Sequence, residues 1–186
     1  GGRRPAPDGR SVNIIENSSF EVGSTKWYYY GNTKVKPLEM DIDTTVGRTG
    51  SNSVKLEAGP SSANKIITSQ IYYLKPNTQY TASMYYKRPD TNGYVSVDIH
   101  VKKANSDDAF ANTYTRIAPT IEDGNWHRMS VAFMTTAYRG YYLQINYVES
   151  SYPGAYVYVD DVQLEEGASA TDYAPIANAE IGWTVN

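Results

Sequence analysis

Apolar and polar residues alternate with a period of two through most of this chain, and this pattern restricts the fold to packed β-sheets. Residues 80–87, 94–101 and 141–147 each place apolar side chains at every second position. That spacing puts the apolar side chains on one face of a strand, whereas a helix repeats every 3.6 residues or so, at about 100° per residue. Helical periodicity is nearly absent, so the sequence predicts an all-β protein.

Frequent turn signals divide the chain into short strands. Examples are Gly59-Pro60, Asp123-Gly124-Asn125 and Pro153-Gly154, where glycine, proline and asparagine favour tight turns. Many short strands separated in this way are typical of a two-sheet antiparallel β-sandwich of jelly-roll type. The predicted strands are 12–16, 26–30, 34–42, 52–58, 65–73, 79–88, 93–103, 113–118, 126–135, 140–148 and 155–165.

Length and composition exclude several classes of protein. At 186 residues the chain has the size of one domain with a substantial core. Its 17 basic and 20 acidic residues are scattered, which argues against a nucleic-acid binder with a basic stripe. The chain has no cysteine, which excludes disulfides and thiolate metal sites. No apolar run approaches the roughly 20 residues of a membrane helix, so we expect no membrane segment.

Tyrosine supplies most of the aromatic side chains, with 18 tyrosines beside 3 tryptophans and 3 phenylalanines. A tyrosine ring suits a half-buried strand because the ring packs while its hydroxyl stays hydrated. An ordinary Tyr-rich surface and a sugar-binding face are both consistent with this composition. Alternation predicts that the buried set is Tyr80, Ala82, Met84, Tyr86, Val95, Val97, Ile99, Val101, Tyr141, Leu143, Ile145 and Tyr147.

The opposite, outward positions mix rings with amides, hydroxyls and charges. An amide both donates and accepts hydrogen bonds, so Gln and Asn beside Tyr suit sugar hydroxyls. In the segment Trp27-Tyr28-Tyr29-Tyr30 we expect Trp27 in the core and the two flanking tyrosines on the opposite face. The predicted ligand-binding residues are Tyr28, Tyr30, Tyr85, Tyr94, Asp98, His100, Tyr142, Gln144 and Asn146.

Four motifs in order along residues 12–166 resemble one family. They are the opening Asn13-Ile14-Ile15-Glu16-Asn17-Ser18-Ser19-Phe20-Glu21, the turn and strand 46–56, the hairpin 74–83 with Pro76-Asn77-Thr78, and the closing strand 156–167 with Asp160-Asp161. Residues 126–133 also resemble a strand in which a Trp and a Phe are buried. Together these motifs resemble the β-sandwich carbohydrate-binding modules of families 4, 9, 16 and 22.

This resemblance implies a fold and a function. The first and last strands of such modules pair, so the two ends bracket one domain, 12–167, after a linker or cloning remnant at 1–11. Residues 168–186 then form an exit linker or begin a following module. The resemblance implies a non-catalytic module that binds a β-linked chain (β-glucan, xylan or mannan class) on a concave sheet. We expect Tyr85, Tyr94 and Tyr142 to lie in that one sheet.

The resemblance also implies a structural calcium ion. In the family the ligands come from the first strand, a Gly-containing turn and the last strand; the matching residues are Glu21, Gly50, Ser51, Asn52 and one of Asp160 and Asp161. Adjacent carboxylates in an apolar strand repel unless a cation or hydrogen bonds offset their charge. Calcium prefers such oxygen ligands. The alternative is that these acids only end strands in solvent.

Partners and location follow from the same resemblance. We expect a polysaccharide or oligosaccharide ligand, a covalently linked glycoside-degrading module, a monomeric state, and secretion or cell-surface display by a bacterium. Nucleic acid and membrane are not expected partners. Lys87-Arg88 and Lys102-Lys103 would favour an acidic polysaccharide if they flanked the cleft.

Two rival functions stay open on the sequence. Glu39, Asp41 and Asp43 alternate on one strand as the carboxylates of laminarinase-type glycosidases do, although retention needs carboxyl groups about 5–5.5 Å apart. An exposed edge strand is the simpler interpretation of these acids. Similar sandwich modules also serve as spacers or adhesins in phage tail and bacterial surface proteins, where the face would carry no sugar site.

Overall fold

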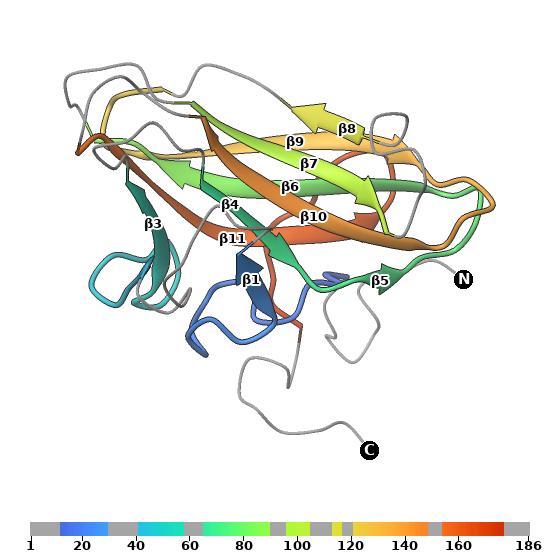
Figure 1. The fold of residues 1–186 in the computed structure, drawn as a ribbon, viewed down its shortest axis with the longest axis horizontal. Coiled ribbons are helices and arrows are strands. Elements are labelled where there is room, and N and C mark those ends of the chain that lie inside the picture. The colour runs from blue at the N-terminus through green and yellow to red at the C-terminus, as the bar shows by residue number, and fades with distance from the viewer. Residues whose placement is uncertain are drawn as a thin grey trace.

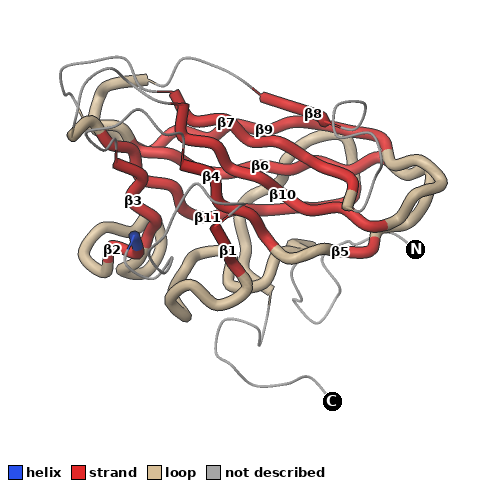
Figure 2. Tube along the Cα trace, viewed as in Figure 1, coloured by secondary structure: helices blue, strands red, loops and turns tan. Residues whose placement is uncertain are grey.

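The protein is a sandwich of two antiparallel β-sheets (Figure 1). The computed structural model describes residues 12–29, 41–57, 65–89, 96–104, 113–116, 121–148 and 154–176. Nearly all of these residues form strands and the loops between them (Figure 2). Within these ranges there is no helix of the length and apolar character that a bilayer crossing requires. The predicted fold class is therefore confirmed.

The six-stranded sheet faces the viewer in Figure 1. Its strand order is β1-β4-β10-β7-β8, and β5 pairs with the start of β10. A break after Ser69 separates β4 from β5, where the Ser69 hydroxyl accepts the Leu143 amide at 3.0 Å. The strands are β1 (Trp27–Tyr29), β4 (Lys65–Ser69), β5 (Tyr72–Tyr73), β7 (Ser96–Lys103), β8 (Thr113–Arg116) and β10 (Gly140–Val148).

The five-stranded sheet lies behind it, in the order β2-β3-β11-β6-β9. Its central strand is the last one in the sequence, which pairs with β3 on one side and β6 on the other. The register of β11 against β6 shifts between Asp160 and Gln163. The strands are β2 (Ile42–Asp43), β3 (Ser53–Glu57), β6 (Gln79–Lys87), β9 (Trp126–Met134) and β11 (Tyr156–Glu166).

The core fills the space between the sheets with the side chains that alternation assigned to it. Leu143, Ile145 and Val101 are fully buried. Burying one such aliphatic side chain stabilises the folded state by about 1.5–3 kcal/mol relative to leaving it exposed. Val95 and the side chain of Tyr147 lie outside the described part of the chain. The confirmed core predictions are Tyr80, Ala82, Met84, Tyr86, Val97, Ile99, Val101, Tyr141, Leu143 and Ile145.

The two tryptophans of the described residues differ in their burial. Trp27 is buried as predicted, packs on Phe20 at 5.0 Å between ring centroids, and donates its indole N–H to the Asn17 carbonyl. Trp126 was expected in the core with Phe133, but only Phe133 is buried. Trp126 and Phe133 are seven positions apart on β9, an odd separation that places them on opposite faces. Trp126 therefore lies half-buried on the outer face.

The two ends of the domain meet through one amide side chain. Asn13, which is fully buried, accepts the Leu164 amide at 3.1 Å and the Ile15 amide at 3.0 Å, and it donates to the Val162 carbonyl at 3.0 Å. The Ile14 amide also donates to the Leu164 carbonyl. Residues 12–16 follow β11 without forming a regular strand. The opening and closing segments thus lie side by side, as the resemblance implied.

The chain after β11 folds back onto the same sheet. Thr171 donates its hydroxyl to Glu165 at 2.6 Å, and the Ala174 amide donates to Gln163 at 3.0 Å. Glu165 and Gln163 point outward from β11, yet they are 1% and 0% exposed. Residues 171–174, which the sequence assigned to a linker, therefore pack on the sheet and satisfy its buried polar groups.

Replacing Asn13 with alanine should lower the free energy of unfolding by about 2–3 kcal/mol. The change leaves the buried amides of Leu164 and Ile15 and the Val162 carbonyl without partners, and buried unsatisfied groups cost about 1–3 kcal/mol each before relaxation. Urea unfolding measures the loss. Ser130→Ala, at an exposed position of β9, should change stability by less than about 0.5 kcal/mol; equal losses would contradict the role of Asn13.

Candidate functional site

A row of outward residues crosses the six-stranded sheet at one level. Tyr28 of β1 pairs with Thr68 of β4, Thr68 with Gln144 of β10, and Gln144 with His100 of β7. Directly paired residues on antiparallel strands point to the same face. Asn146 and Asp98 form the next pair along, and Tyr142 the pair on the other side. Six of the nine predicted ligand-binding residues therefore share this face.

Polar side chains in the middle of this face form a directed chain of hydrogen bonds. The Gln144 amide donates to Asn146 Oδ1 at 2.9 Å, and the Asn146 amide lies 3.0 Å from His100 Nε2. Asn146 Nδ2 is a donor only, so His100 Nε2 accepts from it. His100 Nε2 is also 3.9 Å from Asp98 Oδ2. These hydrogen bonds fix the orientation of Gln144, Asn146 and His100. The sequence pattern predicted only the face on which they lie.

Asp98 lies beside this chain of hydrogen bonds and is not joined to it, because its distance of 3.9 Å from His100 is too long for a hydrogen bond. The residue is 4% exposed, and its Oδ1 atom has no hydrogen-bond partner among the residues that the structure describes. A buried acceptor without a partner costs about 1–3 kcal/mol. Folding therefore leaves on this face a carboxylate oxygen that a hydroxyl donor would satisfy.

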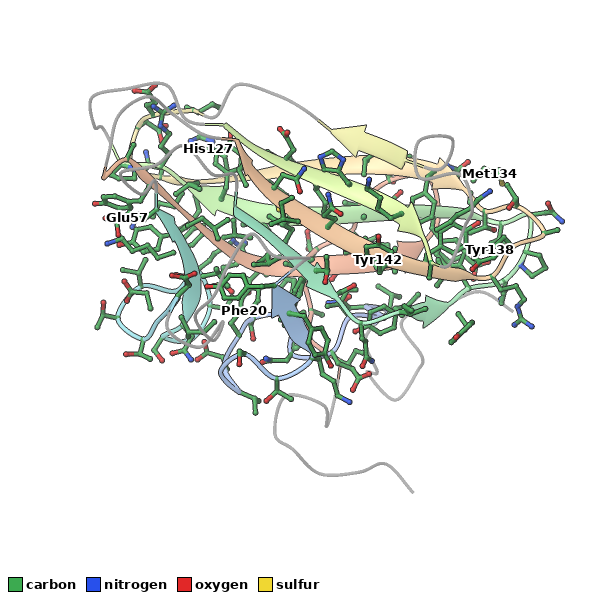
Figure 3. The ribbon with its side chains drawn as sticks, in the orientation of Figure 1. Phe20, Glu57, His127, Met134, Tyr138 and Tyr142 are labelled. Carbon is green, nitrogen blue, oxygen red and sulfur yellow. The ribbon has the colours of Figure 1, made fainter. Side chains whose placement is uncertain are left out.

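Aromatic side chains flank the polar chain. Tyr142 is half-buried near the start of β10 (Figure 3), and Tyr28 is 53% exposed at the edge strand β1. Rings and amides together match the predicted composition of a sugar-binding face. Tyr30 and Tyr94, two other predicted members, lie outside the described residues.

Tyr85 corrects the predicted site. It belongs to β6, whose neighbours are β9 and β11, so it lies in the five-stranded sheet and not beside Tyr142. Its ring is also covered: the Arg48 guanidinium carbon lies 3.5 Å from the ring centroid and that of Arg128 lies 5.2 Å away. Alternation correctly predicts that Tyr85 points away from the core. The outer face on which it lies is that of the five-stranded sheet, on the opposite side of the sandwich from Tyr142. The expectation of one sheet holding Tyr85 and Tyr142 was wrong.

The residues predicted to bind calcium gather at one corner beside β11. Asp160 and Asp161 are both fully buried, and Asp161 has a φ of 51° at the register shift of the strand. Asp161 forms an ion pair with Arg48 at 2.8 Å and accepts the Thr49 hydroxyl at 2.7 Å. Asp160 accepts the backbone amides of Arg48 at 2.7 Å and Asp161 at 2.8 Å.

Glu21 holds the other side of the same turn. Its two carboxylate oxygens accept the amides of Ser51 at 2.9 Å and Asn52 at 2.7 Å. Gly50 has a φ of 65°, and a Cβ there would lie 2.2 Å from Glu21 Oε1. Glycine is thus required twice, by the backbone conformation and by the close approach of the carboxylate.

All six carboxylate oxygens at this corner accept a hydrogen bond from a donor within the protein. Among the described residues there is no group of three or more His, Cys, Asp or Glu side chains arranged to hold a metal. In this arrangement Arg48, Thr49 and backbone amides of the turn donate to the carboxylates, so the oxygens that would bind calcium are engaged within the protein. Arg48 and Thr49 were missed from sequence; the signal was an Arg inside the very turn that the resemblance placed beside an Asp pair. Calcium at this corner stays a prediction.

The same corner makes stability depend on pH. Burial, with the neighbouring Asp161 charge, raises the pKa of Asp160 to about 9 against the lowering effect of the hydrogen bonds it accepts. Burial also raises the pKa of Asp161, opposed by Thr49 and Arg48. The folded state then holds a proton above pH 4 that the unfolded state, with an Asp pKa of about 3.9, has released. Stability from this group is complete below that pH and falls as pH rises toward the folded pKa.

The difference in melting temperature between the protein and Asp160→Asn isolates this effect. In a chelator, the protein should lose stability relative to the variant as pH rises from 5 to 8, because only the protein carries the titrating carboxyl. The variant should be less stable at every pH, since its amide nitrogen faces an N–H donor. A bound calcium ion would instead raise the melting temperature and remove the pH difference, and a pH difference of opposite sign would contradict the raised pKa.

The acids of the alternative catalytic strand are also engaged. Tyr29 donates its hydroxyl to Asp41, and Asp43 accepts the amide and hydroxyl of Thr45 at 2.8 and 2.7 Å. Asp43 caps a turn: burial acts to raise its pKa, but the hydrogen bonds from Thr45 and the charge of Lys55 together lower it. Glu39 lies outside the described residues. These contacts are those of turn and strand stabilisation.

Comparison with known proteins gives one family match and several similar folds. The model of the carbohydrate binding domain family, CBM_4_9, matches residues 12–151. A tRNA(Glu)-specific nuclease, WapA, of Bacillus subtilis subsp. natto is 25% identical over 178 residues, which is 91% of this chain and 7% of that protein. The chain thus spans less than a tenth of the length of this curated relative.

Two solved structures of carbohydrate-binding modules are similar in fold. A family 61 module, in complex with β-1,4-galactotriose, has a TM-score of 0.60 and 14% identity over 84% of this chain and all of that one. A family 22 xylan-binding domain of Paenibacillus barcinonensis has a TM-score of 0.55 and 17% identity over 82% of this chain and 94% of that one. These similarities show the sandwich fold alone, and any argument about a ligand has to come from the side chains of this chain.

Proposed function

The chain belongs to the carbohydrate binding domain family, and from this premise we propose that it binds a β-linked polysaccharide through the outer face of its six-stranded sheet. The residues that would contact the sugar are Tyr28, Asp98, His100, Tyr142, Gln144 and Asn146. The β-glucan, xylan or mannan class follows from the family resemblance, and the similar structures add galactan as a class to test. Binding would be modest, about micromolar to millimolar, because polar groups gain little over water.

One observation carries this proposal: a buried acceptor without a partner among the described residues lies beside an oriented set of hydrogen-bonded side chains. Gln144, Asn146 and His100 hold each other in fixed directions, and Asp98 Oδ1 lacks a donor. Sugar hydroxyls donate to carboxylates, while an aromatic ring packs on the apolar face of a pyranose. Preorganised polar groups with a flanking ring discriminate ligands by hydroxyl orientation.

We propose that the module is non-catalytic, and that it is displayed outside a bacterial cell as part of a larger protein that degrades polysaccharide. Asp41 and Asp43 are engaged in hydrogen bonds to Tyr29 and Thr45, which supports a structural role for them. The nuclease activity in the relative's name describes a protein of which this chain matches 7%, and it forms no part of the proposal.

Tyr142→Ala should weaken binding to a neutral β-linked oligosaccharide by about 1–3 kcal/mol, or about 5- to 150-fold, by analogy with stacking on other planar ligands. Calorimetry with cello-, xylo-, manno- and galacto-oligosaccharides measures the affinity. Tyr85→Phe, on the other sheet, is the matched control and should bind normally. Unchanged affinity in Tyr142→Ala for every sugar that binds would reject this face.

Asp98→Ala should lose affinity without losing stability. The substitution removes the acceptor that the sugar would satisfy, and it also removes the cost of burying an unpartnered oxygen, about 1–3 kcal/mol. Melting temperature and sugar affinity measured on the same samples separate the two effects. A variant that unfolds earlier and binds as before would show that Asp98 serves the fold.

A further inference from the structure

The outer face of the five-stranded sheet carries a second arrangement of rings and charges. One residue from each of four adjacent strands pairs in register: Lys55 of β3, Tyr158 of β11, Lys87 of β6 and Trp126 of β9. Cations and rings alternate along this line, which we name the cation–ring row. Neighbouring strands are about 4.8 Å apart, so the two lysine backbones are separated by about 10 Å. All four residues are half-buried.

Further cations and rings border the row on both sides. Tyr156 lies on one side, with Lys55 Nζ 4.4 Å from its ring centroid. On the other side Tyr85 contacts Arg48 and Arg128. Lys87 Nζ is 5.9 Å from the Trp126 ring. Each of these distances lies within the range of cation–π attraction, so the rings hold the cations close to the sheet.

These cations are short of anionic partners. Among the described residues, Lys55, Lys87 and Arg128 form no ion pair, whereas Lys26, Lys75 and Arg88 elsewhere each have one. Arg128 donates one N–H to Ser83 at 3.0 Å, and its Nε is buried without a partner. The acids of this face are exposed Glu57, buried Glu165, which accepts from Thr171, the buried Asp pair at the corner, which pairs with Arg48, and Asp43, which accepts from Thr45 and whose charge interacts with Lys55. Among the described residues Lys87 and Arg128 are left without a carboxylate partner, in a chain whose net charge is −3.

We propose that this face is a second glycan-binding surface, and that its ligand is a linear polysaccharide bearing carboxylates. Lys55, Lys87 and Arg128 would contact the carboxylates, and the hydroxyl of Tyr158 and the Trp126 indole would contact sugar hydroxyls between them. The surface lies on the opposite side of the sandwich from Tyr142 and Asp98. The proposal therefore stands independently of neutral-sugar binding on the six-stranded sheet.

Ring geometry favours a carboxylated polysaccharide over a single-stranded nucleic acid. Sequence-tolerant binding of nucleic acid uses open aromatic faces on which bases stack. Tyr85 and Tyr156 each have a cation against the ring, so their faces are taken. Trp126 has Lys87 Nζ 5.9 Å from its ring, and the rings of Tyr158 and Tyr156 pack edge-on at 5.5 Å. The row therefore presents mainly charge and hydrogen-bonding groups, which match carboxylates and hydroxyls.

The test compares two double variants of the whole chain that remove the same charge from opposite sheets. Lys55→Met with Lys87→Met alters the cation–ring row, and Lys102→Met with Lys103→Met alters β7. The probes are polygalacturonate and its fully methyl-esterified form, which keeps the sugars and loses the charge. Affinity electrophoresis and calorimetry measure binding at low and high salt.

The expected result is binding of polygalacturonate, little binding of the ester, and weakening by high salt because exposed charges are screened. The Lys55/Lys87 variant should bind about tenfold more weakly, as expected for the loss of two charge-assisted contacts. The Lys102/Lys103 variant should bind normally, and Tyr142→Ala should lose only neutral sugars. Melting temperatures of both double variants should match that of the protein.

Four outcomes would overturn the proposal: no binding of polygalacturonate, equal binding of the ester, a loss confined to the Lys102/Lys103 variant, or a loss in Tyr142→Ala. Preferred binding of a single-stranded oligonucleotide that depends on Lys55 and Lys87 would assign the face to nucleic acid instead. If the Lys55/Lys87 methionine variant is destabilised, Lys55→Gln with Lys87→Gln serves in its place. If the protein binds polygalacturonate but no neutral sugar, only the proposed neutral-sugar site on the six-stranded sheet is rejected.

Discussion

Burial of the last strand is the constraint on which the rest of the structure depends. β11 is the centre of the five-stranded sheet, and Val157, Val159 and Val162 are fully buried between the sheets. Its outward side is closed as well, by the returning segment that hydrogen-bonds Gln163 and Glu165. A strand buried on both sides must have every polar group satisfied locally. Asn13 and Arg48 supply those partners from segments far away in the sequence, and Thr171 supplies them from the segment that follows the strand.

This requirement gives the two outer faces different chemistry. On the five-stranded sheet the polar side chains at one end of β11 are hydrogen-bonded within the protein. The other end of the same outer face carries the lysines and rings of the cation–ring row. On the six-stranded sheet no segment among the described residues performs that role for Asp98, whose Oδ1 stays without a partner. The sandwich therefore separates a face rich in cations and rings from one whose centre is a hydrogen-bonded set of amides beside the Asp98 carboxylate.

The strand pattern could be predicted from the sequence because period-2 alternation is a local property. The predicted segments 79–88 and 140–148 became β6 and β10 within a residue at each end, and the buried sets on them are correct. Alternation says only which side of its own strand a residue faces. It carries no information on which sheet the strand joins, so the placement of Tyr85 beside Tyr142 rested on the family resemblance, and that placement is wrong. Trp126 was misplaced for another reason: the family motif was given more weight than the parity of its position relative to Phe133.

Side-chain partners were less predictable than faces. The sequence identified Asp160 and Asp161 as a pair that needs a counter-charge, and the structure supplies Arg48 at 2.8 Å. That one guanidinium also lies 3.5 Å from the ring of Tyr85, so it joins the buried corner to the outer face. Arg48 is thereby unavailable to a ligand, whereas among the described residues Lys55, Lys87 and Arg128 form no ion pair, and only Lys55 has a carboxylate, that of Asp43, acting on it from farther away. The corner thus makes Arg48 a structural cation, and Lys55, Lys87 and Arg128 are the cations of this face that an anionic partner could contact.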